Sequence, residues 1–149
     1  MEQENRAHPG PVSSRHMEMR IPESLKSMLG ADRVILVASA DRAGRVHLAA
    51  ARGLLLLDEE HLATENWFCR RTIGNLEENP TVAVAVLAQE EGRGFELTAR
   101  VEQVLPLATL DGYPAEEARH PGRYPQSKSQ LRFCVETVRE LTTGPHLDD

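Results

Sequence analysis

Residues 81–104 read TVAVAVLAQEEGRGFELTARVEQV. In residues 81–87 valines alternate with threonine and alanine, and in residues 95–104 bulky apolar side chains alternate with glutamate, threonine and arginine. A period of two is typical of a strand with one buried face. The connecting residues 90–94 contain two glycines, which favour a turn. We therefore predict two antiparallel strands joined by a short turn.

The same pattern extends over the rest of the chain. Further strands are expected over residues 32–41, 46–57, 61–66 and 131–141, and short helices over 21–29 and 70–79. Residues 108–130 are interrupted by glycine and proline and predict loops with one helical turn. Six strands with two to three short helices indicate a mainly β (α+β) fold, a small antiparallel barrel with flanking helices.

Composition limits the partners of the protein. The 149 residues include 17 basic and 23 acidic side chains, which gives a net charge of −6. An acidic chain lacks the electrostatic footprint of a nucleic-acid-binding protein, so no nucleic acid is expected. No stretch approaches the roughly 20 apolar residues that a membrane-spanning helix needs, so no membrane association is expected.

The chain suits one domain. Residues 1–20 mix charged residues, histidine and proline without apolar periodicity and predict a flexible N-terminal arm, whereas residues 21–149 predict a single domain. Two cysteines, Cys69 and Cys134, are too few for a secreted disulfide framework. We therefore expect a cytoplasmic protein.

Catalytic motifs are absent from the sequence. It contains no Gly-x-Ser-x-Gly, no Gly-rich phosphate loop followed by Lys-Ser/Thr and no His-Glu-x-x-His, and no histidine neighbours either cysteine in the sequence. The six histidines are scattered over predicted tails, loops and strands. No catalytic residue is assigned, and no metal site is expected.

The most informative residues are Arg70, Arg71 and Thr72, where a predicted strand gives way to a predicted helix. Guanidinium groups, a hydroxyl and free helix N-terminal amides together bind phosphate well. The alternative is a solvated basic edge whose arginines pair with Glu77 or Glu78. Spacing alone favours neither interpretation.

Several stretches resemble the pyridoxamine 5′-phosphate oxidase-like family of flavin-binding split barrels. The stretches are Val37–Asp41 with Gly44, Arg71–Pro80, Val82–Val84 and Gly94–Leu97. The second resembles the family's Lys-Thr-x-x-Asn-Leu-x-x-Asn-Pro signature, with Arg71 in place of the lysine.

The resemblance implies a six-stranded antiparallel split β-barrel that forms a homodimer, with an FMN in each of two interface clefts and a small-molecule redox partner. Arg70, Arg71 and Thr72 would hold the FMN phosphate. The other residues implied to lie along the cofactor are Ala49, Ala50 and Ala51 of the second strand and Glu65 and Asn66 of the third. Small alanines suit the close approach of a flat ring, and tight barrel packing explains them equally well.

Two positions depart from the vitamin B6 oxidases of the family. Those enzymes carry an arginine near Ala49 or Ala50 and a glutamine where Glu96 stands here. An acidic side chain near a phosphate dianion weakens its binding. We therefore expect an FMN-binding oxidoreductase or electron-transfer protein that does not oxidise pyridoxamine phosphate. The alternative is a non-enzymatic carrier or sensor of FMN, the deazaflavin F420 or haem on the same fold.

Overall fold

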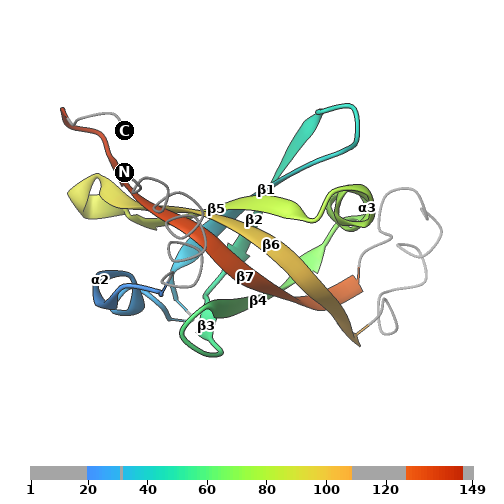
Figure 1. The fold of residues 1–149 in the computed structure, drawn as a ribbon, viewed down its shortest axis with the longest axis horizontal. Coiled ribbons are helices and arrows are strands. Elements are labelled where there is room, and N and C mark those ends of the chain that lie inside the picture. The colour runs from blue at the N-terminus through green and yellow to red at the C-terminus, as the bar shows by residue number, and fades with distance from the viewer. Residues whose placement is uncertain (1–19, 31, 109–126, 146–149) are drawn as a thin grey trace, which may run out of the picture.

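A seven-stranded antiparallel sheet forms the body of the protein (Figure 1). The computed structural model describes residues 20–30, 32–108 and 127–145. The strands are β1 (Val34–Ala40), β2 (Val46–Arg52), β3 (Leu55–Leu56), β4 (His61–Phe68), β5 (Thr81–Ala88), β6 (Arg93–Ala108) and β7 (Ser127–Thr142). Their order in the sheet is β2-β1-β5-β6-β7-β4-β3. The mainly β prediction is confirmed.

The helices are short. They are α2 (Glu23–Lys26), α3 (Arg70–Glu78) and the 3-10 turn η2 (Gln89–Glu91). The first is shorter than the 21–29 span expected, whereas the second matches its prediction closely. The predicted arm falls almost wholly on residues 1–19, and most of the loop region expected at 108–130 falls on residues 109–126, so both lie outside the described residues.

The extra strand arises where one strand was expected over residues 46–57. Gly53 has a φ of +85°, a backbone conformation that residues other than glycine rarely adopt, and Gly53 and Leu54 separate β2 from β3. Both backbone groups of Gly53 are hydrogen-bonded, which stabilises this interruption between the strands. The Gly53 amide donates to the Arg33 carbonyl at 2.7 Å, and the Gly53 carbonyl accepts from the Thr64 hydroxyl at 2.9 Å.

β2 and β4 approach one another without a backbone ladder. Thr64 reaches the Gly53 carbonyl, Asn66 Nδ2 donates to the Ala50 carbonyl at 2.7 Å, and Cys69 Sγ lies 3.3 Å from His47 Nε2. Residue numbers fall on one side as they rise on the other, so the two segments run antiparallel. We call this line of side-chain contacts between the β2 and β4 segments the seam.

The core comes from the inward faces of the strands. β5 shows the alternation expected from its sequence, with Val82, Val84 and Val86 buried between more exposed neighbours. Leu25 of α2 is completely buried and belongs to the same core. The largest buried side chains from the other strands are Ile35, Leu62, Phe68, Leu97, Leu131 and Phe133.

Gly94 is required by a close approach of two strands. A Cβ placed on Gly94 would overlap the carbonyl oxygen of Val86 on β5. Gly94→Ala should therefore destabilise the fold by about 1–3 kcal/mol, because backbone must move to admit the methyl group. Urea denaturation measures the change.

Gly74→Ala is the matched control. Gly74 lies inside α3, and nothing lies within 4 Å of its Cβ position. Alanine there should raise the free energy of unfolding by about 0.5–1 kcal/mol. Equal stability of the two variants would contradict the packing described.

Candidate cofactor site

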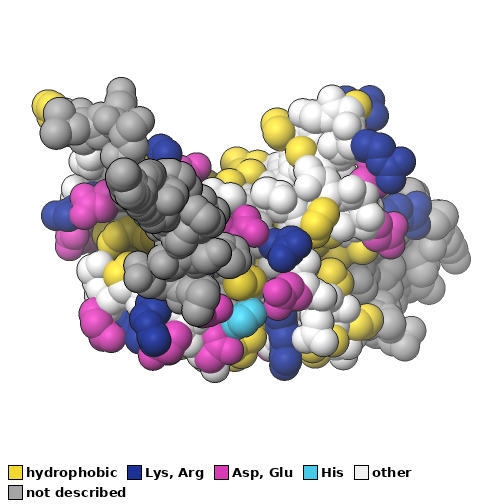
Figure 2. Space-filling view, viewed as in Figure 1, with side chains coloured by type: hydrophobic (Ala, Val, Ile, Leu, Met, Phe, Trp, Pro, Cys, Tyr) yellow, Lys and Arg dark blue, Asp and Glu magenta, His cyan; other side chains and the backbone are white. Residues whose placement is uncertain are grey.

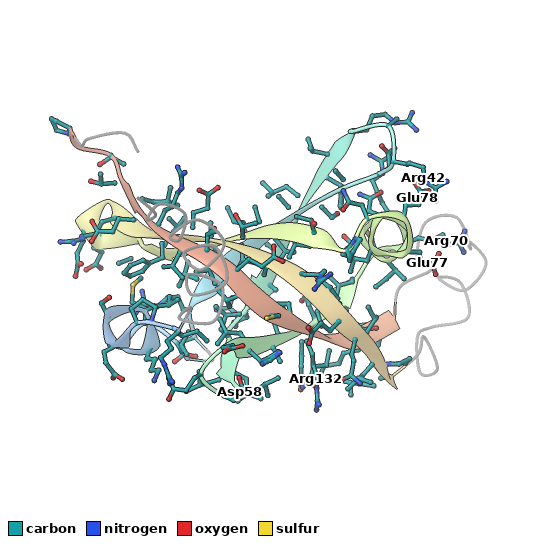
Figure 3. All side chains as sticks on the ribbon, in the orientation of Figure 1. Arg42, Asp58, Arg70, Glu77, Glu78 and Arg132 are labelled. Carbon is teal, nitrogen blue, oxygen red and sulfur yellow. The ribbon has the colours of Figure 1, made fainter. Side chains whose placement is uncertain are left out.

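The start of α3 carries two exposed arginines, Arg70 and Arg71. Figure 3 shows Arg70 extending away from the sheet. No ion pair joins either arginine to Glu77 or Glu78, all four of which the structure describes. Glu78 instead accepts a hydrogen bond from the Arg42 amide at 2.8 Å. The pairing offered as the alternative explanation of the arginines is therefore absent.

The remainder of α3 is fixed against the barrel. Asn75 is buried, and its Nδ2 donates to the Ser39 hydroxyl of β1 at 3.0 Å. Thr72 is only 1% exposed, and its hydroxyl lies 3.7 Å from Cys69 Sγ. Of the three predicted phosphate residues, two thus face solvent and Thr72 faces inward.

The three alanines of β2 do not share a face. Ala51 is buried and Ala49 packs against the core, whereas Ala50 is exposed. This follows from the period of two along a strand. Ala50 contributes its carbonyl to the seam. This carbonyl accepts a hydrogen bond from Asn66 of β4, which is another of the predicted cofactor residues.

Glu65 belongs to a polar network between β4 and β7. Gln130 Nε2 donates to Glu65 Oε2 at 3.0 Å, and Arg132 Nε donates to Gln130 Oε1 at 2.6 Å. Glu65 and Gln130 also line a groove of about 300 Å³. The other residues lining that groove are Gly30, Arg52, Gly53, Leu54, Leu55, Ala63 and Thr64.

The groove and the arginines are separate features of one chain. None of the three predicted phosphate residues, Arg70, Arg71 and Thr72, lines the groove at Glu65. A larger cavity of about 490 Å³ lies at Arg33 and Leu87 and includes none of the predicted cofactor residues. Neither of these two cavities therefore unites the predicted cofactor set, although the seam runs alongside most of it.

Each cysteine has a histidine beside it in space. In the sequence, by contrast, no histidine neighbours either cysteine. Cys69 and His47 meet across the seam at 3.3 Å. His61 and Cys134 occupy opposed positions on β4 and β7. Both pairs are non-local, so no sequence motif signals them.

The environment of Cys69 favours negative charge. Partial burial raises the pKa of the thiol, but the Thr72 amide and hydroxyl and the Arg71 amide favour the thiolate and bring the pKa below the ordinary 9.0. Amides and a helix N-terminus stabilise an anion in the same way. The first turn of α3 can thus hold negative charge beside the exposed guanidinium groups of Arg70 and Arg71.

The family model described as "Pyridoxamine 5'-phosphate oxidase" matches residues 21–142. The chain belongs to this family, and its fold is the split barrel expected from the sequence. No curated protein matches the sequence. No helix in the described part of the chain has the length and apolar character to cross a membrane.

Solved structures share the fold at low sequence identity. HupZ from Group A Streptococcus has a TM-score of 0.60 at 20% identity, covering 86% of this chain and 99% of its own. A structure named F420 reductase has a TM-score of 0.56 at 21% identity, covering 80% and 98%. An FMN-binding protein from Syntrophomonas wolfei has a TM-score of 0.55 at 14% identity, covering 89% and 90%.

The lowered pKa of Cys69 can be measured by alkylation. Because the thiolate is the reactive form, the rate of iodoacetamide labelling at Cys69 should reach half its maximum below pH 9.0. Thr72→Val removes the hydroxyl with little change in volume and should move this midpoint upward. Peptide mass spectrometry across a pH series gives the rate at Cys69 itself. A midpoint at or above 9.0 in the wild type would show that burial outweighs the hydrogen bonds.

Proposed function

We propose that this protein binds FMN at the seam and acts as an FMN-dependent oxidoreductase or electron-transfer protein. The observation that carries the proposal is the pair of exposed arginines without ion-pair partners among the described residues, placed at the start of α3. Membership of the pyridoxamine 5′-phosphate oxidase family supports a flavin, and the similar FMN-binding structure agrees with it.

The phosphate end of FMN would lie at α3. Arg70 and Arg71 offer forked donors, and the first-turn amides add partial positive charge. Thr72 is buried against Cys69, so its side chain supports the turn from the inside, and its amide and hydroxyl favour the thiolate of Cys69. In a chain of net charge −6, two arginines that have no ion-pair partner within residues 20–30, 32–108 and 127–145 give a local basic site that suits a dianion.

The ring end of FMN would lie along β2 and β4. Ala50 and Asn66 meet there, and Glu65 lines the adjoining groove of about 300 Å³. Bound FMN supplies the redox chemistry, and the protein contributes position and electrostatics. Glu96 lies on β6 opposite Arg139 of β7 and beside Ala85 of β5, so it is not part of the seam.

The second subunit would complete the site. The β1–β2 hairpin projects from the body of the molecule (Figure 1), and hydrophobic side chains lie exposed on the projection (Figure 2). Val46 is 75% exposed and Leu48 is 59% exposed. Exposed apolar side chains beside a half-formed cofactor cleft favour a homodimer whose interface encloses the FMN.

Replacing Arg71 tests the phosphate site. Arg71→Ala should weaken FMN binding about 10- to 100-fold, the equivalent of one lost charge-assisted hydrogen bond. Quenching of flavin fluorescence on titration gives the dissociation constant. Arg93→Ala, which removes an exposed arginine at the start of β6, should leave the affinity unchanged. Wild-type affinity in the Arg71 variant would contradict the proposed site.

Replacing Leu48 tests the dimer. Light scattering should give twice the 16.6 kDa chain mass for the wild type, and Leu48→Asp should shift the protein toward monomer and lower its FMN affinity. Thr137→Asp places the same charge on an exposed position of β7 and should remain dimeric. A wild-type protein of monomer mass at all concentrations would reject the shared cleft.

Reduction of the bound flavin separates the enzyme from the carrier. Bleaching of the flavin absorption by NADH or NADPH under anaerobic conditions supports an oxidoreductase, whereas flavin that stays oxidised supports a non-enzymatic carrier or sensor. Protein that does not bind FMN but binds F420 or haem would support a carrier or sensor of that cofactor on the same fold. The similarity to a structure named F420 reductase makes F420 the first of these to try.

A further inference from the structure

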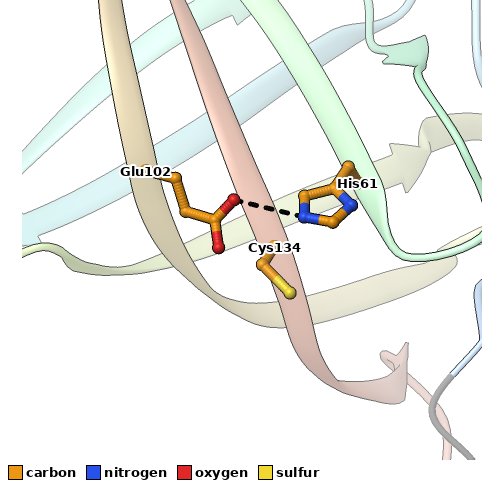
Figure 4. A group of neighbouring side chains, drawn as sticks. All are labelled: His61, Glu102 and Cys134. Carbon is orange, nitrogen blue, oxygen red and sulfur yellow. Dashed lines mark ion pairs between the residues drawn. The ribbon is translucent and has the colours of Figure 1, made fainter. Parts of the chain in front are cut away.

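Three strands bring together side chains with three different donor atoms. His61 of β4, Glu102 of β6 and Cys134 of β7 each offer one ligand atom, and these atoms all lie within 4.8 Å of one another (Figure 4). His61 Nε2 lies 3.2 Å from Glu102 Oε1. None of the three residues belongs to the proposed FMN site.

A β-bulge places Glu102 in this group. Val101 opposes Phe133 and Gln103 opposes Arg132, so Glu102 is the additional residue on β6 without a register partner. The bulge shifts the alternation, so that Glu102 and Gln103 are both exposed after the buried Val101. Bulges commonly redirect a side chain in this way. The Glu102 carboxylate consequently meets His61 across β7.

Asp58 orients the imidazole of His61 through the ring nitrogen that does not face Glu102. His61 Nδ1 lies 2.8 Å from Asp58 Oδ1, and Asp58 is itself fixed because it accepts the amides of Glu60 and His61 at 2.8 and 2.9 Å. Nε2 therefore faces Glu102 and Cys134. A carboxylate on the second ring nitrogen is the usual outer partner of a metal-binding histidine.

We propose that His61, Glu102 and Cys134 bind a divalent zinc ion, with Asp58 orienting the histidine. Zinc accepts nitrogen, sulfur and carboxylate oxygen ligands, whereas magnesium and calcium take oxygen ligands. Three protein ligands leave a fourth tetrahedral position for water. The site is open to solvent, since the His61 and Glu102 side chains are 30% and 45% exposed.

The competing explanation is an ion pair alone. A protonated His61 between Asp58 and Glu102 would account for the two carboxylates, with Cys134 present only because β4 and β7 pair in this register. This explanation gives the thiol no part in binding. Zinc binding that depends on Cys134 therefore separates the two explanations.

The first experiment is a zinc titration of the reduced full-length protein in competition with a chromophoric chelator. The wild type should bind one zinc ion at this site, and Cys134→Ser should weaken that binding by more than about 100-fold, beyond the 10- to 100-fold that loss of an outer partner costs. Asp58→Asn should weaken it about 10-fold. The matched control is Cys69→Ser, which removes the other histidine-paired thiol and should retain wild-type affinity.

Cobalt provides a second measurement. Co²⁺ added to the wild type or to Cys69→Ser should give a thiolate-to-metal charge-transfer absorption that Cys134→Ser lacks. If circular dichroism shows that Cys134→Ser does not fold, the zinc titration uses Glu102→Gln instead, because Glu102 is exposed and its replacement should leave the fold intact. Zinc affinity that is unmeasurable in the wild type, unchanged in the ligand variants or lost in Cys69→Ser would overturn the proposal.

Discussion

The seam between β2 and β4 is the constraint on which the candidate cofactor site depends. β2 ends the sheet, so its outer backbone groups have no strand partner, and an unpaired edge is a liability in a β protein. The Asn66 side chain donates to the Ala50 carbonyl of β2, and the Thr64 hydroxyl donates to the carbonyl of Gly53, the residue that follows β2. These contacts align β2 with β4, and α3 follows β4 directly.

Local pattern predicted most of the sheet. The alternation in β5 and β6 and the basic start of α3 are local properties of the sequence, and the structure has them at the expected residues. The division of residues 46–57 into two strands was missed because it depends on the positive φ of Gly53 and on its bonds to Arg33 and Thr64. Those partners are distant in sequence.

The candidate sites show the same limit more strongly. The exposed position of Arg70 and Arg71 at the start of a helix could be predicted because the arginines and the helix start are adjacent in the chain, whereas the burial of Thr72 could not be foreseen. The pairing of His47 with Cys69 and of His61 with Cys134 requires the strand register. The position of Glu102 requires, in addition, a bulge that the alternating pattern of β6 conceals. Non-local register is thus the information that single-sequence reasoning lacked.

A line of side-chain bonds has a different mechanical character from a backbone ladder. Breaking two or three such bonds leaves every strand of the sheet paired with its remaining neighbours, so β2 can swing outward at a fraction of the free energy of global unfolding. The separation of β2 from β4 can therefore change at the seam. Such a movement leaves unchanged the six ladders that hold the strands.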